Sequence, residues 1–119
     1  MTNKKHLGDW GEALARQYLE RRGYQFISNN YKAQYAELDL IFRKGGQHIF
    51  IEVKTRTKNT DSVRENTLSA RQVKNLKKAI CSYCLAAKIR LESIRLDLIV
   101  ILVDRATRRA DLTHYLDIV

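Results

Sequence analysis

The chain has 119 residues, of which 45% are hydrophobic and 29% are charged, a balance typical of one globular domain around one core. Its net charge is +9 and its pI is about 9.8, so we expect an anionic partner. A membrane partner is not expected, because the sequence has no apolar run of membrane-spanning or signal-peptide length and no basic amphipathic helix with bulky aromatics. These features favour a single cytoplasmic domain over residues 1–119 that binds nucleic acid.

The first predicted element is a helix from Lys5 to Arg22, ended by Gly23 as a C-terminal cap. Its apolar residues gather on one side at helical spacing. Glu12 falls on the border of that apolar side. A border carboxylate either points toward a neighbouring site or is simply solvated, and the residues alone leave both interpretations open.

A strand is predicted over Tyr24–Tyr31, followed by a β-hairpin whose two alternating runs, AELDLIFR and QHIFIEVK, flank Gly45 and Gly46. If Lys44 pairs with Gln47, the register places four charged side chains on one face and six apolar side chains on the other. The charged set consists of two opposed pairs, Asp39 with Glu52 and Glu37 with Lys54. The apolar set is Leu38, Leu40, Phe42, Ile49, Ile51 and Val53.

The charged face of this hairpin has two interpretations. In the first, it is solvated and Glu37 forms a cross-strand ion pair with Lys54. In the second, Asp39 and Glu52 bind a divalent cation such as Mg²⁺, which takes carboxylate and carbonyl oxygens and retains several waters. Like charges placed opposite each other on a sheet are unfavourable unless something compensates them. In that case Lys54 would lie beside the metal and hold a phosphate oxygen or an attacking water.

Residues Thr55–Thr67 are polar and aperiodic, which predicts a loop that leaves the charged end of the hairpin. Ser69 and Gln72 then form a capping box that begins a second helix. The loop and the polar face of this helix are basic, and we expect both to contact phosphates. The residues concerned are Arg56, Lys58, Arg64, Arg71, Lys74 and Lys78.

The same helix carries Cys81 and Cys84 at the spacing of a redox or zinc motif. A redox pair belongs at a helix N-terminus and a zinc site needs four ligands, whereas this pair lies more than a turn inside the helix and has no second pair. A structural role is therefore favoured over a redox or metal role.

The run Ile94–Val103 is almost continuously apolar, which predicts a strand buried on both faces and parallel to a neighbour. Asp97 is the charged residue in its interior. After a turn over Asp104–Arg108, a last strand is expected over Arg109–Ile118. The predicted order is αβββαββ, an α/β fold in which a mixed central sheet with a right-handed crossover is flanked by two helices.

This order and its motifs resemble the PD-(D/E)XK, or restriction-endonuclease-like, nuclease superfamily, with Asp39 as the first acid and Glu52-Val53-Lys54 as the second element. The chain is more closely similar to the YraN family of small bacterial proteins over nearly its full length. The motifs that carry this resemblance are GDWGEALARQYLERRGY, ELDLI, FIEVKTR and RLDLI. Ala36 departs from the glycine that this family usually has before its Glu-x-Asp.

The resemblance implies a metal-dependent endonuclease that hydrolyses DNA phosphodiesters, with branched DNA as a substrate by similarity to archaeal Holliday-junction resolvases. Asp39, Glu52 and the Val53 carbonyl would bind one or two Mg²⁺ or Mn²⁺ ions, Lys54 would be the catalytic lysine, and Glu12 the helix acid that completes such sites. The alternatives are an inactive module that binds DNA or RNA, with DNA favoured, and a protein scaffold. The sequence leaves a homodimer open.

Overall fold

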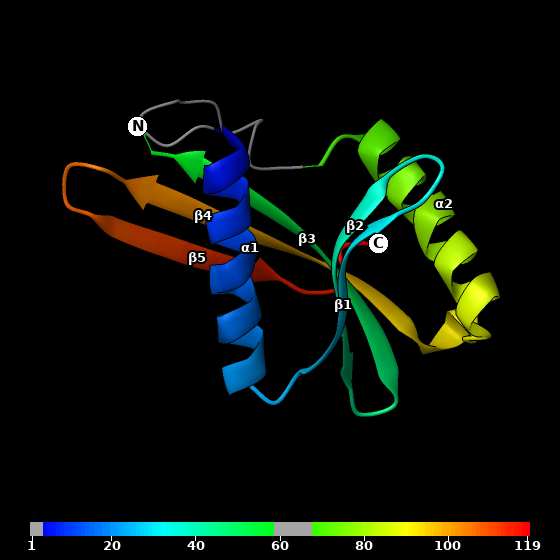
Figure 1. Cartoon of the computed structure of the whole chain (residues 1–119). Helices are drawn as coiled ribbons and strands as arrows, with labels where there is room; N and C mark the ends of the chain where they lie inside the picture. Colours follow the sequence, from blue (N-terminus) through cyan, green and yellow to red (C-terminus); the bar gives the residue numbers. More distant parts are fainter. Residues whose placement is uncertain (1–3, 59–67) are drawn as a thin grey trace.

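The computed structural model describes residues 4–58 and 68–119, and it consists of a five-stranded mixed sheet between two helices (Figure 1). The strands lie in the order β1-β2-β3-β4-β5; β3 and β4 are parallel, and the other neighbours are antiparallel. The predicted αβββαββ arrangement of a restriction-endonuclease-like fold is therefore confirmed. Its elements are α1 (Lys4–Arg21), β1 (Gln25–Lys32), β2 (Glu37–Lys44), β3 (Gln47–Thr57), α2 (Ala70–Ala87), the short 3-10 helix η2 (Leu91–Ser93), β4 (Ile94–Asp104) and β5 (Arg109–Tyr115).

The two helices cover opposite faces of the sheet with separate hydrophobic clusters. Successive side chains of a strand point to opposite faces, and in β4 Ile99 belongs to the α1 cluster while Leu96 belongs to the α2 cluster. This position between two clusters explains why β4 is almost continuously apolar, as the sequence predicted. The helical residues at the centre of the clusters are Ala15 and Leu19 of α1, and Leu76, Ala79, Ile80 and Cys84 of α2.

The helix ends agree with the expected caps. Gly23 follows α1 with a φ of +85°, a left-handed conformation that glycine adopts without a steric penalty. At the start of α2, the Ser69 side chain accepts a hydrogen bond from the Gln72 amide, and the Gln72 side chain accepts one from the Ser69 amide. Neither described helix is both long enough and apolar enough to cross a membrane.

Two predicted boundaries are wrong. The segment Thr55–Thr57 was expected to begin a loop, but it continues β3 because these residues pair with Ile101–Val103 of β4. At the other end of the chain, β5 stops at Tyr115, three residues before the predicted end at Ile118. Arg64, predicted to contact phosphate, lies outside the described residues.

The face of the β2–β3 hairpin that carries the charged residues is not solvated along its length. Near the turn, Ile41 and Phe50 occupy that face and are fully buried in the α2 cluster. Leu38 also joins the α2 cluster, although the alternation placed it on the same face as Leu40, which packs in the α1 cluster. The simple alternation therefore holds near the turn and fails toward the start of β2.

Candidate active site

The failure of the alternation coincides with a division of the sheet. The β2–β3 ladder has the predicted register from Lys44–Gln47 to Leu40–Ile51, and these are its pairs in the described structure. Beyond them β2 remains paired with β1, and β3 remains paired with β4. In Figure 1, β1 and β2 accordingly turn toward α2, while β3, β4 and β5 run toward the opposite side. We call this divergence the fork, formed by Glu37–Asp39 of β2 and Glu52–Lys54 of β3.

Asp39 and Glu52 meet at the fork through their side chains, not as a pair in the backbone ladder. The Val53 amide, which would face Leu38 if the ladder continued, donates to Asp39 Oδ2 at 2.9 Å. The carboxyl groups of Asp39 and Glu52 are also hydrogen-bonded to each other. Because an ionised carboxylate only accepts hydrogen bonds, this contact requires a proton between the two groups.

The pKa values of the pair agree with a shared proton. Burial, followed by the charge of Asp39, raises the pKa of Glu52 to about 9. Burial also raises the pKa of Asp39, although the hydrogen bond from the Val53 amide opposes the shift. Glu52 is therefore protonated near neutral pH, and a bound cation would compete with that proton.

Lys54 supplies positive charge beside this pair. Its side chain belongs to a residue that is only 7% exposed, and its charge lowers the pKa values of both Asp39 and Glu52. Burial raises those pKa values by more than Lys54 lowers them, so one ammonium does not neutralise the site. The predicted triad of Asp39, Glu52 and Lys54 is thus brought together in the described structure.

Glu12 reaches the fork because α1 packs unusually close to β3. A Cβ atom placed on Gly11 would lie 1.8 Å from the Thr55 hydroxyl oxygen, so a glycine is required at this crossing. Burial raises the pKa of Glu12 to about 7; the hydrogen bond from Asn30 opposes this, and the charge of Asp39 adds to it. Glu12 is therefore a half-buried acid within electrostatic range of the pair.

Asn30 is a component of the site that the sequence analysis missed. Its Nδ2 donates to Glu12 Oε1 at 3.0 Å and to Glu37 Oε1 at 2.9 Å, which ties α1 to β2. Asn30 has a φ of +50°, a conformation that asparagine tolerates better than most residues. The pair Asn29-Asn30 was interpreted only as the end of a strand. Beside Asn30, a cavity of about 390 Å³ opens between α1 and β1.

The predicted phosphate-binding residues are not part of the fork. The Arg56 guanidinium donates to the Thr55 carbonyl oxygen at 2.9 Å, and Lys58 is exposed just beyond β3. Arg71, Lys74 and Lys78 are exposed on α2, where the Lys78 ammonium lies 4.5 Å from the centre of the exposed Tyr35 ring. Within the described residues, no hydrogen bond or ion pair connects these five residues to the acids of the fork.

The residues at the fork fit a hard cation that keeps most of its own water. Across residues 4–58 and 68–119, no three Asp, Glu, His or Cys side chains are grouped as a complete metal site. Mg²⁺ is nevertheless commonly bound through one or two carboxylates, with waters and substrate phosphate completing the shell. Asp39 and Glu52 form such a two-carboxylate set, and Asp39 raises the pKa of Glu52 and is hydrogen-bonded to it, so a positive charge between them would be stabilised. Glu12 lies outside this inner set.

Asp97, the charged residue inside β4, belongs to a separate network on the α1 face. Its Oδ1 accepts from Arg95 Nε at 2.8 Å and from the Asp117 amide at 2.9 Å. Its Oδ2 accepts from Arg95 Nη2 and from His114 Nε2, both at 2.8 Å. Burial alone would raise the pKa of Asp97, but the hydrogen bonds from His114, Arg95 and the amide outweigh it and lower the pKa. All acceptor positions of this carboxylate are occupied by the protein itself.

The two cysteines are free thiols in different environments. Cys84 is buried in the α2 cluster, where burial raises the pKa of its thiol, and Cys81 is exposed. A raised pKa disfavours the reactive thiolate. The C-x-x-C spacing therefore places one cysteine in the core and the other outside it.

Comparison with known proteins gives a family. Residues 11–101 match the model of the Uncharacterised protein family UPF0102. The chain is 38% identical over 100 residues to a UPF0102 protein of Syntrophomonas wolfei subsp. wolfei, covering 84% of this chain and 87% of that protein. It is 33% identical over 106 residues to a UPF0102 protein of Christiangramia forsetii, covering 89% of this chain and 88% of that protein. The chain therefore belongs to UPF0102, the family that the motifs predicted under the name YraN.

Proposed function

We propose that this protein is a Mg²⁺- or Mn²⁺-dependent endonuclease that hydrolyses DNA phosphodiesters at the fork. The observation that carries the proposal is the half-buried pair of Asp39 and Glu52, whose carboxyl groups meet beside the buried Lys54 and whose pKa values are both raised by burial. In a protein of net charge +9, two adjoining carboxyl groups whose pKa values are raised are suited to a divalent cation that replaces their proton, and the positive charge of the whole protein is suited to a polyanion.

In this proposal Asp39, Glu52 and the Val53 carbonyl hold the cation. When bound, such a cation polarises a phosphoryl oxygen and acidifies a water. The hydrogen bond from the Val53 amide fixes Asp39 Oδ2 and leaves Oδ1 for the cation. Glu52 must give up its proton first, so cation binding competes with protonation and strengthens as the pH rises.

Lys54 and Glu12 have different roles in the proposed reaction. The Lys54 ammonium orients the attacking water and offsets negative charge that develops on the phosphate; action as a base would require a pKa well below the ordinary value of about 10.4. Glu12, whose pKa is raised to about 7, exchanges a proton near neutral pH and thus suits proton transfer to or from the solvent around the fork.

A cleavage assay tests the proposal directly. Linear, forked and four-way DNA are incubated with the wild type in Mg²⁺, in Mn²⁺ and in EDTA, and cleavage is expected only with metal. Asp39→Asn, Glu52→Gln and Lys54→Ala should each lower the cleavage rate by on the order of a hundredfold or more while DNA binding persists. Glu20→Gln, which removes an exposed carboxylate of α1, is the matched control and should cleave normally.

The outcomes separate the competing functions. If a variant of the triad cuts at the wild-type rate, the substituted residue has no part in the proposed mechanism. If the wild type binds DNA but cuts none of the substrates with either metal, the protein is a nucleic-acid-binding module that keeps the fold without the chemistry.

The basic residues outside the fork are proposed to bind phosphate. Each phosphate neutralised on duplex DNA contributes about 0.9 to the slope of log K against log salt concentration. A Lys74→Gln/Lys78→Gln variant on α2 should therefore bind more weakly and with a shallower slope, with its cleavage rate at saturating DNA preserved. A slope unchanged from that of the wild type would place the DNA elsewhere on the surface.

A further inference from the structure

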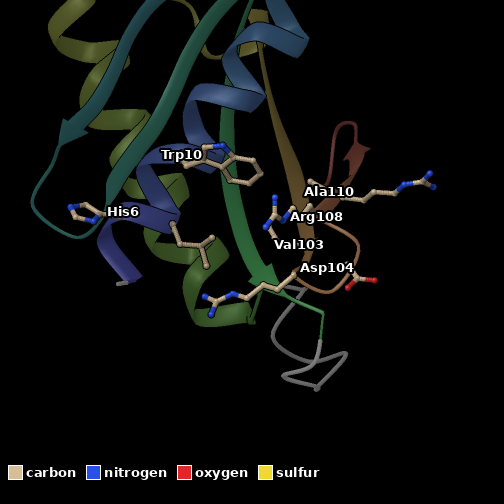
Figure 2. A pocket seen from close by; sticks show the side chains of 9 residues that line it. His6, Trp10, Val103, Asp104, Arg108 and Ala110 are labelled. Carbon is tan, nitrogen blue, oxygen red and sulfur yellow. The ribbon is translucent and has the colours of Figure 1, made fainter. Parts of the chain in front are cut away.

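A second cavity lies at the carboxyl end of β4, the strand next to β3 of the fork. It has a volume of about 650 Å³ and opens between the first half of α1 and the β4–β5 turn. Figure 2 shows the Trp10 indole projecting from α1 toward Arg108 of that turn. We call it the Trp10 pocket; its lining includes His6, Trp10, Val103, Arg105, Arg108 and Arg109.

The aromatic wall of this pocket is exposed. Trp10 is the single tryptophan of the chain and is 45% exposed. It belongs to neither hydrophobic cluster of the described structure. A large aromatic side chain left open in a cavity offers a flat apolar surface to a ligand.

The rest of the wall is positively charged. Arg105, Arg108 and Arg109 are exposed, and within the described residues no ion pair engages them. The one acid of the lining is Asp104, and its Oδ1 accepts from the amides of Ala106 and Thr107 at 3.0 and 3.4 Å. That carboxylate is therefore used to form the turn, and the three guanidinium groups are available to an anion.

An open indole beside unpaired guanidinium groups suits a nucleotide, whose base stacks on the ring and whose phosphates meet the arginines. A base within a duplex is already stacked on its neighbours, so the nucleotide must be unpaired. The pocket also lies at the end of the β-strand that neighbours Lys54. Lys54 pairs with Val100 of β4, and Val103 of the pocket lies three residues farther, about 10 Å along the strand.

We propose that the Trp10 pocket binds an unpaired nucleotide of a single-stranded segment that adjoins the strand held at the fork. The proposal rests on the proposed function for the position of that segment relative to the fork. Binding in the pocket itself needs neither metal nor cleavage, so it can be measured separately.

Tryptophan fluorescence of the full chain tests the proposal, because Trp10 is its single tryptophan. The protein is titrated at low salt in EDTA with an oligothymidylate and with an abasic oligomer of equal length, which keeps the phosphates and lacks the bases. We expect saturable quenching by the oligothymidylate. The abasic oligomer should bind, as followed by fluorescence anisotropy of a labelled end, with little quenching.

Two variants separate the base contact from the phosphate contact. Trp10→Ala should weaken binding of the oligothymidylate by roughly 5- to 100-fold and leave binding of the abasic oligomer unchanged. Arg108→Asn should weaken binding of both oligomers and lower the salt slope by about 0.7. Asparagine tolerates the φ of +58° at this position, so the turn is preserved. Arg21→Gln removes an exposed arginine at the other end of α1 and should change neither affinity.

Three results would overturn the proposal: no binding of the oligothymidylate, binding without quenching, or equal quenching by the abasic oligomer. Quenching by an acidic peptide but not by the oligothymidylate would identify a different ligand and overturn it as well. None of these results decides cleavage at the fork. If the oligothymidylate quenches the fluorescence of a wild type that cuts no DNA, the proposed pocket is retained and the proposed nuclease function is rejected.

Discussion

The sheet contains two carboxylate sites, one buried and one half-buried, whose environments shift the pKa in opposite directions. At Asp97, four donors of the protein occupy the carboxylate oxygens, and the pKa of the acid is lowered. At the fork, Asp39 receives one backbone donor and shares a proton with Glu52, and the pKa values of both acids are raised. The first site is stabilised as an anion by the fold, whereas the second holds a proton because the fold supplies too little positive charge.

This difference distinguishes a structural acid from a candidate reactive one. A buried charge is tolerated when it is paired and fully hydrogen-bonded, and Asp97 meets that condition while joining β4 to β5 and to the C-terminal Asp117. Two acids with raised pKa values that face each other cost stability, and such costs are typical of functional sites. Acids that are placed together to bind a cation also raise each other's pKa values when no cation is bound.

Removal of the Asp97 charge should have the largest effect. Asp97→Asn removes the charged partner of the Arg95 guanidinium. The Arg95 side chain is only 17% exposed, so water does little to compensate for the loss. Breaking one side of a buried ion pair costs about 3–5 kcal/mol, and we expect the free energy of unfolding to fall by that amount in urea titrations. Asp111→Asn, which alters an exposed acid of β5, should change it by less than about 0.5 kcal/mol. If Asp97→Asn lowers the free energy of unfolding no more than the control does, the distinction between the two sites is not supported.

The next effect concerns the close crossing that brings Glu12 to the fork. Gly11→Ala introduces a Cβ atom 2.9 Å from the Thr55 Cβ and closer still to its hydroxyl oxygen, and overpacking of this kind costs about 1–3 kcal/mol. Gly8→Ala on the same helix meets no atom within 4 Å and should instead stabilise the protein by up to about 1 kcal/mol. Thermal melts of the two variants should therefore shift in opposite directions. Equal shifts would show that the crossing at Gly11 is not tight.

A smaller effect is expected from Glu52→Gln in the absence of metal. The unfolded chain releases the Glu52 proton near its ordinary pKa of 4.5, and the folded chain releases it near 9. Between these values the folded state binds more protons, so the free energy of unfolding of the wild type falls as the pH rises. Glutamine does not titrate, and its amide can still donate to Asp39. The variant should be more stable than the wild type by about 1 kcal/mol or more at pH 8. The difference between the two free energies of unfolding should shrink toward pH 5. A difference that stays constant over this range would show that Glu52 is not the group that titrates.

The fold was largely predictable because its signals are local. The glycine turn, the alternation beside it, the capping box of Ser69 and Gln72 and the apolar run of β4 each depend on neighbouring residues, and each is found in the structure. The register near the hairpin turn could be predicted for the same reason, but it does not extend to the predicted pairs of Asp39 with Glu52 and Glu37 with Lys54, because the ladder ends at Leu40 and Ile51.

The remaining features depend on contacts between distant segments. The fork arises because β2 follows β1 while β3 follows β4, and the hairpin sequence contains no sign of that division. Asn30 acquires its role from α1 and β2 together. Trp10 fits the apolar pattern of its helix, and its exposure is decided by where the β4–β5 turn lies. The arginine-rich turn DRATRR was visible in the sequence, but only its function as a turn was predicted.

The most direct test of the central claim is the thermal stability of the free protein with and without metal. Wild type and Asp39→Asn are melted at pH 8 in EDTA and in excess Mg²⁺ or Mn²⁺, with Asp111→Asn as the control. In EDTA, Asp39→Asn should be more stable than the wild type by about 0.2–1 kcal/mol, because it removes a charge that raises the pKa of Glu52 and so lowers the cost of folding at a pH above the ordinary pKa of that acid. Metal at a hundredfold excess over its Kd should stabilise the wild type and the control by about 2.7 kcal/mol and the variant by far less. If the wild type shows no metal-dependent shift and Asp39→Asn melts below it in EDTA, the acids at the fork do not form a cation site in the free protein.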